Sequence, residues 1–152
     1  MKPRVLFLCT GNSCRSQMAE GFLRSLAGDR FDVASAGTDP VPVNPDAIEA
    51  MSEVGIDISA HESKPVKGFL GQHFAYVITV CDRASERCPI FPGAVKRLEW
   101  NFPDPAGVTG SEIERHRMFQ QVRDQIADRI RGFLDTEALS VSGPGMRERR
   151  DI

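Results

Sequence analysis

Two stretches of the chain, residues 5–8 and 75–80, are apolar with almost no polar interruption. Strands that are exposed on one face alternate apolar and polar residues, so continuous runs of this kind predict strands buried on both faces. Two further segments bounded by turn-forming residues, 31–36 and 95–100, predict two more strands. The pattern therefore predicts four strands, of which the first and third are the most deeply buried.

Apolar residues three or four positions apart predict helices between these strands. The first helix carries its apolar stripe from Met18 onward. The second begins at Asn44, a residue type favoured as an N-cap, and has Pro45 at its first helical position and Gly55 at its end. Residues 65–74 show only weak helical character.

The last helix has the clearest pattern. Ser111 and Glu114 form a capping box, and apolar residues then recur every three or four positions as far as residue 134. The sequence after that point lacks the stripe and ends in a glycine- and charge-rich segment. We therefore expect residues 1–134 to form a single domain and residues 135–152 to be a mobile tail.

Strands that alternate with helices predict an α/β fold of three layers, in which a parallel sheet has right-handed crossovers and helices on both faces. Ligands of such sheets bind beyond the carboxyl ends of the strands. A cysteine stands at that end of each long apolar run, Cys9 after the first and Cys81 after the second. We therefore expect these two thiols at the same edge of the sheet.

The loop between the first strand and the first helix consists mainly of small residues and runs from Cys9 to Ser16. Such a loop directs several backbone N–H groups at one point, where the helix dipole adds partial positive charge, and so forms a cradle for an anion. Arg15 adds a planar fork of donors suited to a tetrahedral oxyanion. The positive field favours the thiolate of Cys9, the Ser16 hydroxyl can donate to the sulfur, and Asn12 can adopt an unusual backbone conformation.

Composition excludes some other functions. The chain is 41% hydrophobic and 26% charged with a formal net charge of -2, which is typical of a globular domain and does not favour nucleic acid as a partner. No apolar run approaches the length of a membrane span, and the residues before the first strand leave no room for a signal peptide. We therefore expect a cytoplasmic protein whose four cysteines stay reduced.

A zinc site built from these cysteines is the main non-enzymatic alternative. Their spacings, Cys-x4-Cys and Cys-x6-Cys, exceed those typical of structural zinc sites. A zinc site would also leave the anion cradle unexplained. We therefore expect no bound metal and no cofactor.

The motif Cys9-Thr-Gly-Asn-Ser-Cys-Arg-Ser16 resembles the loop of low-molecular-weight protein tyrosine phosphatases and of the bacterial arsenate reductases with the same fold. The resemblance implies a four-stranded parallel sheet in the order 2-1-3-4, with the first and third strands side by side. It also implies that the loop binds the oxyanion substrate. The residues that would do so are Thr10, Gly11, Asn12, Ser13, Cys14, Arg15 and Ser16.

Three features favour the reductases over the phosphatases. Cys81 and Cys88, seven residues apart, match the resolving cysteines of the thioredoxin-coupled arsenate reductases, whereas the phosphatases need no such pair. Phosphatases of this fold commonly have aromatic residues near their general acid, and Ala106-Gly107 offers none. Gln17 stands where those phosphatases usually have proline. The resemblance therefore implies an arsenate reductase, with a low-molecular-weight tyrosine phosphatase as the alternative.

The resemblance also implies a role for each reactive residue. Cys9 attacks arsenate held by Arg15, and Asp104 is the general acid that protonates the departing oxygen. Cys81 and then Cys88 resolve the intermediate, and thioredoxin reduces the disulfide that results. We expect the protein to act as a monomer.

Two further expectations concern the surroundings of the loop. Cys14 lies inside the loop and is expected to be structural. Some of these reductases hold a potassium ion near the loop with an Asn, a Glu, a Ser and an Asp. Asn12, Glu20 and Ser35 match that set, but Lys64 stands at the position of the Asp. We expect the ammonium group of Lys64 to substitute for the cation.

Overall fold

The computed structural model describes residues 2–80, 96–107 and 109–142. At its centre is a four-stranded sheet in which all strands are parallel and follow the order β2-β1-β3-β4, so the expected topology is confirmed. The strands are β1 (Arg4–Cys9), β2 (Asp32–Gly37), β3 (Tyr76–Thr79) and β4 (Lys96–Glu99).

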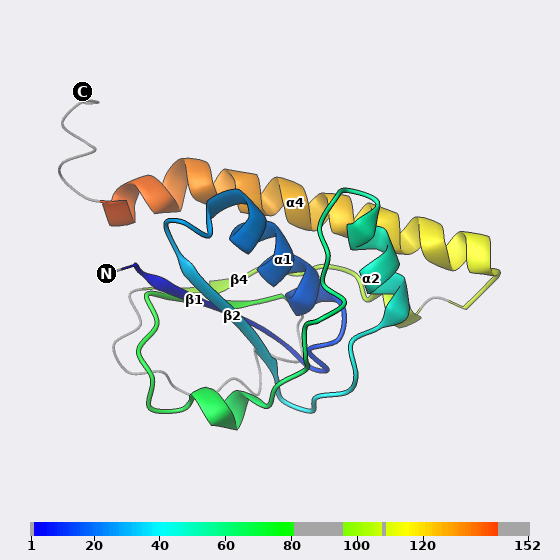
Figure 1. Ribbon diagram of the computed structural model, residues 1–152, viewed down its shortest axis with the longest axis horizontal. Coiled ribbons are helices and arrows are strands. Elements are labelled where there is room, and N and C mark those ends of the chain that lie inside the picture. Colours follow the sequence, from blue (N-terminus) through cyan, green and yellow to red (C-terminus); the bar gives the residue numbers. More distant parts are fainter. Residues whose placement is uncertain (1, 81–95, 108, 143–152) are drawn as a thin grey trace.

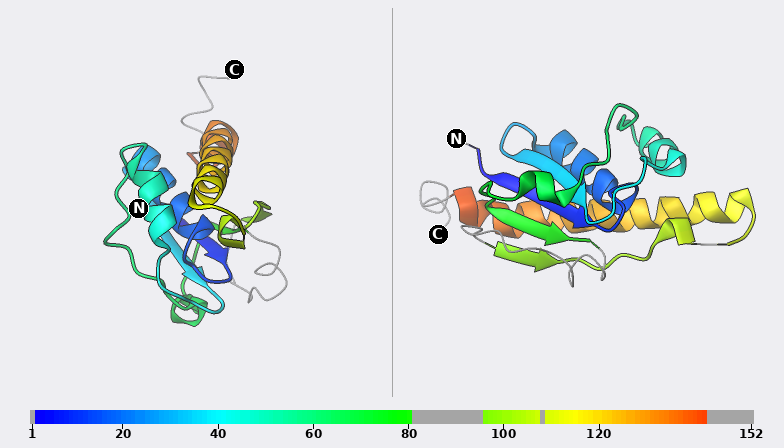
Figure 2. Two further views of the ribbon diagram at one scale, coloured as in Figure 1. Left: turned by 90° about the vertical axis from the view of Figure 1, so that its right-hand side faces the viewer. Right: turned by 90° about the horizontal axis from the view of Figure 1, so that it is seen from below.

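Helical elements lie on both sides of this sheet. The α-helices are α1 (Arg15–Ala27), α2 (Pro45–Ser52) and α4 (Glu112–Ser142), and the 3-10 helices are η1 (Val66–Phe69) and η2 (Pro105–Gly107). α1 and α4 lie side by side on one face, and α2 packs against both (Figure 1). η1 lies on the opposite side (Figure 2). The described residues thus form the predicted layers, with the α-helices together on one side.

An aromatic cluster joins α4 to the sheet. The ring centroid of Phe133 lies 4.9 Å from that of Tyr76 in β3, and 5.9 Å from those of Trp100 and Phe31. All four side chains are buried. In β1 every residue after Arg4 is buried, as its uninterrupted apolar run predicts. The strand that ends in Cys9 is therefore held from both faces.

α2 and α4 begin where the sequence predicts. The side chain of Asn44 accepts a hydrogen bond from the backbone N–H of Asp46 at 2.8 Å, and Pro45 is the first residue of α2. At the start of α4, the Ser111 hydroxyl oxygen accepts from the Glu114 N–H at 3.1 Å, and the Glu114 carboxylate accepts from the Ser111 N–H at 3.0 Å. The capping box is confirmed.

Two elements differ from their predicted extent. α4 does not end at residue 134 but continues to Ser142, so the first part of the expected mobile tail is helical. An apolar stripe marks the part of a helix that packs on its neighbours and does not determine where the helix ends. Within residues 65–74 only η1 is helical, and the φ of 86° at Gly71 lies in the left-handed region, which is incompatible with a continued helix.

Gly37, the last residue of β2, lies directly beside the loop that follows β1. A Cβ atom at this position would be 2.6 Å from the carbonyl oxygen of Thr10 and 2.9 Å from the backbone nitrogen of Asn12. Both are backbone atoms, so they can move only if the loop moves. A residue without a side chain is therefore required for the loop to lie against β2.

We expect Gly37→Ala to displace the loop and to lower the free energy of unfolding by roughly 1–3 kcal/mol, the range typical of overpacked sites. Urea unfolding followed by circular dichroism measures the change. Gly132→Ala in α4 is the matched control, because no atom lies within 4 Å of the added Cβ. It should raise the free energy of unfolding by up to about 1 kcal/mol, since alanine favours helix. Equal effects of the two substitutions would contradict the steric argument.

Candidate active site

The loop between β1 and α1 places Cys9 at the carboxyl end of a central strand. The residue is almost fully buried, with 2% of its surface exposed. The backbone N–H of Asn12 donates to its Sγ at 3.2 Å, and the Ser16 Oγ lies 2.9 Å from the same atom. Both groups lie within hydrogen-bond distance of the same sulfur atom. Ser16 thus occupies the place beside the sulfur that the sequence predicts.

Asn12 gives the loop its shape. Its φ of 49° lies in the left-handed region, as expected for the residue that bends this loop. Its side chain is fully buried, and Nδ2 donates to Ser16 Oγ at 2.8 Å and to Ser35 Oγ at 2.9 Å. The backbone N–H of Lys64 donates to Oδ1 at 2.9 Å. A backbone N–H can only donate, so this contact determines which end of the amide is oxygen.

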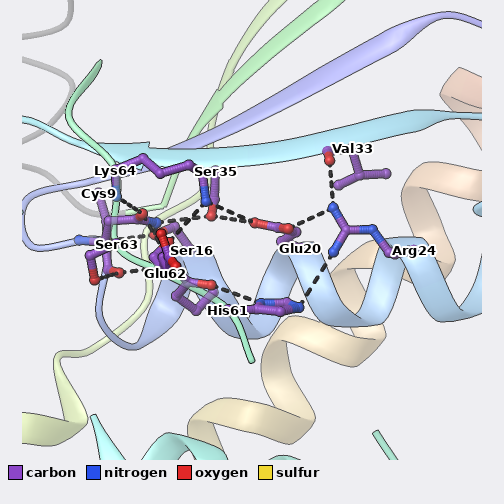
Figure 3. A network of polar contacts seen from close by, with 12 residues as sticks. Cys9, Ser16, Glu20, Arg24, Val33, Ser35, His61, Glu62, Ser63 and Lys64 are labelled. Carbon is purple, nitrogen blue, oxygen red and sulfur yellow. Dashed lines mark hydrogen bonds and ion pairs between the residues drawn. The ribbon is translucent and has the colours of Figure 1, made fainter. Parts of the chain in front are cut away.

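A chain of polar side chains connects Asn12 to the surface of α1. Its members Ser35, Glu20 and Arg24 follow one another in Figure 3. The Ser35 hydroxyl donates to Glu20 Oε1 at 2.5 Å, and Arg24 Nη2 lies 2.6 Å from Glu20 Oε2. Because Glu20 accepts the Ser35 proton, Ser35 accepts from Asn12, and Ser16 likewise accepts from Asn12. The hydroxyl proton of Ser16 is then free to donate to the Cys9 thiolate.

Lys64 lies at the same carboxylate. Its Nζ is 4.0 Å from Glu20 Oε1 and donates to the backbone carbonyl of Glu62 at 2.9 Å. Glu20 is 4% exposed, and a carboxylate so deeply buried needs positive partners. The contact agrees with the expectation that the Lys64 ammonium supplies positive charge here, while its replacement of a bound cation stays a prediction.

Arg15, the first residue of α1, reaches the segment that contains Phe102 and Asp104. Its Nη1 donates to the carbonyl oxygen of Phe102 at 3.1 Å, and its Nη2 lies 3.9 Å from Asp104 Oδ2. Its Nε is buried and has no hydrogen-bond partner among the described residues. A buried donor without an acceptor is costly, and an oxyanion in the loop can supply the missing acceptor.

A cavity of about 710 Å³ opens over the loop. Asp104 lies at its rim and is half exposed, and its Oδ1 accepts from the Ala106 N–H at 3.0 Å. The sequence did not point to Phe102, Asp39 or Val41 as lining residues. Phe102 and Asp39 come after strands or turns with no motif to mark them, so only the folded chain brings them to this cavity.

The predicted site residues fall into three groups. Cys9, Thr10, Gly11, Ser13, Cys14, Arg15 and Asp104 line the cavity. Asn12 and Ser16 are fully buried, so their side chains support the loop from the protein interior and do not line the cavity. Cys81 and Cys88 lie outside the described residues.

Cys14 lies 5% exposed at the start of α1. Burial raises the pKa of its thiol to about 11, an effect that the hydrogen bond from Ser13 opposes. Cys14 is therefore a neutral thiol at physiological pH, which agrees with the structural role expected for it.

Comparison with known proteins identifies the family. Residues 4–142 match the sequence model described as Low molecular weight phosphotyrosine protein phosphatase. The chain belongs to this family. This membership confirms the resemblance that the Cys9 loop indicated. Among the described residues, no helix has both the length and the apolar character needed to cross a membrane.

Within the family, the chain is similar to arsenate reductases. It is 47% identical to "Arsenate reductase" of Shouchella clausii over 135 residues, which cover 89% of this chain and 97% of the relative. A solved structure described as an arsenate reductase in the phosphate binding state has a TM-score of 0.73 and 35% identity, and the match covers 89% of this chain and 98% of that one. The thioredoxin-dependent arsenate reductase Cg_ArsC1' of Corynebacterium glutamicum has a TM-score of 0.70 and 30% identity, covering 91% of this chain and 63% of that one.

We expect alkylation to distinguish the two described cysteines. The raised pKa of Cys14 leaves almost no thiolate at pH 8, so iodoacetamide should modify Cys9 at least about tenfold faster than Cys14. Peptide mass spectrometry after short exposure measures both rates. Modification of both residues at the same rate would contradict the raised pKa of Cys14.

Proposed function

We propose that this protein reduces arsenate to arsenite, with Cys9 as the nucleophile and Cys81 and Cys88 as the resolving cysteines. The identity of 47% to an arsenate reductase over most of both chains supports the substrate. The observation that carries the chemistry is the loop, in which the buried Cys9 thiol lines the same cavity as Arg15, whose Nε lacks an acceptor among the described residues.

Arsenate binds in the cradle of the loop. Its oxygens accept hydrogen bonds from backbone N–H groups of residues 10–15 and from the guanidinium of Arg15, whose planar fork suits a tetrahedral anion. The hydrogen bond from Arg15 Nη1 to the carbonyl oxygen of Phe102 holds the guanidinium in place. Binding in this loop brings arsenic close to Cys9. No metal takes part in the proposed steps.

The first chemical step joins sulfur to arsenic. The Cys9 thiolate attacks arsenic, and the bond from arsenic to one hydroxyl oxygen breaks. Asp104 donates a proton to this oxygen, which leaves as water. The position of Asp104 at the rim of the same cavity, 3.9 Å from Arg15, supports this role.

The second step transfers two electrons to arsenic. The Cys81 thiolate attacks the sulfur of Cys9, the bond between that sulfur and arsenic breaks, and its electron pair stays on arsenic. Arsenic(V) becomes arsenic(III) and leaves as arsenite, while Cys9 and Cys81 form a disulfide. In support, Thr79 of β3 pairs with Leu8 of β1, and the sequence reaches Cys81 two residues later.

The third step restores Cys9. Cys88 attacks the sulfur of Cys81, which frees the Cys9 thiolate and leaves a disulfide between Cys81 and Cys88. The dithiol of thioredoxin then supplies two electrons to reduce this disulfide. Similarity to a reductase described as thioredoxin-dependent supports thioredoxin as the donor.

Hydrolysis of phosphotyrosine is the second candidate function. The family takes its description from phosphatases, and phosphate has the shape and charge of arsenate. Residues 105–107 offer no aromatic side chain, but Phe102, two residues before Asp104, lines the cavity. An aromatic surface near the acid is therefore present, and the resolving cysteines are what distinguish the two functions.

We expect Cys9→Ser to abolish arsenate reduction and also any hydrolysis of para-nitrophenyl phosphate, because both reactions need the thiolate. Cys81→Ser should abolish the reduction alone. The assay couples arsenite formation to thioredoxin, thioredoxin reductase and NADPH, and compares it with release of nitrophenolate. If Cys81→Ser still reduces arsenate through repeated turnovers, the resolving role of Cys81 is wrong.

Cys88→Ala should complete one reduction and then stop as a disulfide between Cys9 and Cys81, because no thiol remains to resolve it. The unaltered protein should stop at the disulfide between Cys81 and Cys88. One turnover without thioredoxin, followed by alkylation and peptide mapping, separates the two outcomes. A Cys9 to Cys14 bridge in the variant would move the resolving role into the loop.

Replacement of sodium by potassium at constant ionic strength should leave the activity unchanged, because the Lys64 ammonium supplies positive charge near Glu20. Lys64→Gln should lower the activity. Lys67→Gln, which removes an exposed charge from η1, is the control and should not lower it. Activation of the unaltered protein by potassium would contradict the substitution of Lys64 for a bound cation.

A further inference from the structure

Gln17 links the Cys9 loop to a histidine at the surface. Its side chain is fully buried in α1, and its Nε2 lies 3.1 Å from each of three acceptors, the carbonyl and Oδ1 of Asn12 and the carbonyl of Glu62. Since backbone carbonyls only accept, this end of the amide is the NH2 group. The other end, Oε1, lies 2.9 Å from His61 Nδ1.

These contacts determine where His61 carries its proton. Gln17 Oε1 can only accept, so His61 Nδ1 must donate. His61 Nε2 lies 3.4 Å from Nη1 of Arg24, a group that always donates, so Nε2 must accept. The neutral imidazole with its proton on Nδ1 satisfies both neighbours. The cation would direct a second N–H at the guanidinium.

His61 and Arg24 also close a ring of contacts. Arg24 pairs with Glu20 and donates to the carbonyl of Val33 at 2.7 Å (Figure 3). From Glu20 the chain runs through Ser35 to the Asn12 side chain, and from His61 it runs through Gln17 to the same residue. Both branches from the surface therefore end on the residue whose N–H donates to Cys9.

The position of His61 does not depend on this ring alone. Its backbone N–H donates at 3.0 Å to the carbonyl of Ile58, which is fully buried. The imidazole is thereby held at the end of an anchored turn. A change in its charge therefore acts on its two side-chain partners.

The groups that face His61 favour the neutral form. Burial lowers the pKa of His61, and the nearby positive charges of Arg24 and Lys64 lower it further, whereas the negative charges of Glu20 and Asp57 act in the opposite direction. The net shift is downward, so the native contacts are present at neutral pH and are lost as the pH falls through this lowered pKa.

We propose that neutral His61 is a positioning residue that holds the Cys9 loop through Gln17, and that protonation of His61 releases this hold. This proposal rests on the proposed role of Cys9 as nucleophile. Protonation places N–H groups on both sides of the ring, so that Arg24 must withdraw or the ring must turn. If Arg24 withdraws, its ion pair with Glu20 weakens. If the ring turns, Gln17 loses its hydrogen bond from His61. Either change reaches Asn12 and lowers the reactivity of Cys9.

The tautomer can be observed directly. A long-range ¹H–¹⁵N spectrum of the full-length protein at pH 7.5 should show His61 neutral with its proton on Nδ1. An imidazolium, or a proton on Nε2 in the neutral ring, would overturn the proposal. This measurement does not depend on arsenate reduction, so it separates a failure of the positioning role from a failure of the proposed function.

The rate of Cys9 alkylation by iodoacetamide, followed by peptide mass spectrometry from pH 5 to pH 8, tests the consequence. His61→Asn keeps an amide N–H near the position of Nδ1 but does not titrate, so it should match the unaltered protein at pH 7.5. The ratio of the unaltered rate to the Asn rate should fall by about fivefold towards pH 5, as for the loss of one hydrogen bond. Protonation of Cys9 itself slows both rates alike, so its effect cancels in this ratio.

His61→Ala should alkylate about fivefold more slowly than the unaltered protein at pH 7.5, because Gln17 loses its partner. Circular dichroism establishes that each variant folds. Parallel pH profiles for the unaltered protein and His61→Asn would overturn the acid release, and an Asn variant as slow as the Ala variant at pH 7.5 would overturn the role of the Nδ1 hydrogen bond. If Cys9 fails to alkylate in every form, the proposed nucleophile is at fault.

Discussion

The left-handed conformation of Asn12 is the constraint on which the site depends. It turns the backbone so that the Asn12 N–H points at the Cys9 sulfur, and it places the side chain between α1, β2 and the segment around Lys64. A non-glycine residue in this conformation is strained unless its surroundings hold it. Here the holding contacts are the same hydrogen bonds that orient the donors of the thiolate. The shape of the loop and the surroundings of the Cys9 sulfur are therefore one property.

The buried charge of Glu20 extends this dependence away from the loop. A carboxylate with 4% of its surface exposed is stable only with positive or hydrogen-bonding partners, and it has them in Arg24, Lys64 and Ser35. Networks of this kind give a single arrangement when every member is satisfied. The cost is that the loop becomes sensitive to changes at Arg24, which is half exposed two turns along α1. A residue at the surface is thus connected to the geometry around Cys9.

Much of this architecture could be predicted from the sequence, because the signals are local. The apolar runs locate β1 and β3, Asn44 and Ser111 locate two helix starts, and the motif from Cys9 to Arg15 locates the loop that lines the cavity. The strand order came from the resemblance and not from periodicity. The end of α4 was missed since an apolar stripe reports burial and says nothing of helix length.

The polar contacts around the loop could not be predicted in the same way. Gln17, His61 and Phe102 carry no motif, and they have partners 45, 44 and 87 positions away along the chain. Sequence separation of that size gives no local pattern, so only the topology brings these groups together. Gln17 illustrates the difference, because the sequence marked it as a departure from the phosphatases but gave no reason for the residue.

The register between β1 and β3 has a consequence for how the protein can change. Leu8 pairs with Thr79, and the Val80 N–H donates to the Leu8 carbonyl at 2.8 Å. The end of β3 therefore lies next to the end of β1, where Cys9 is. A slip of one residue would turn every side chain of β3 to the opposite face. The aromatic contact of Tyr76 with Phe133 resists that slip. Substitutions deep in the core, at Tyr76 or Phe133, can therefore displace the edge of the sheet at which Cys9 lies.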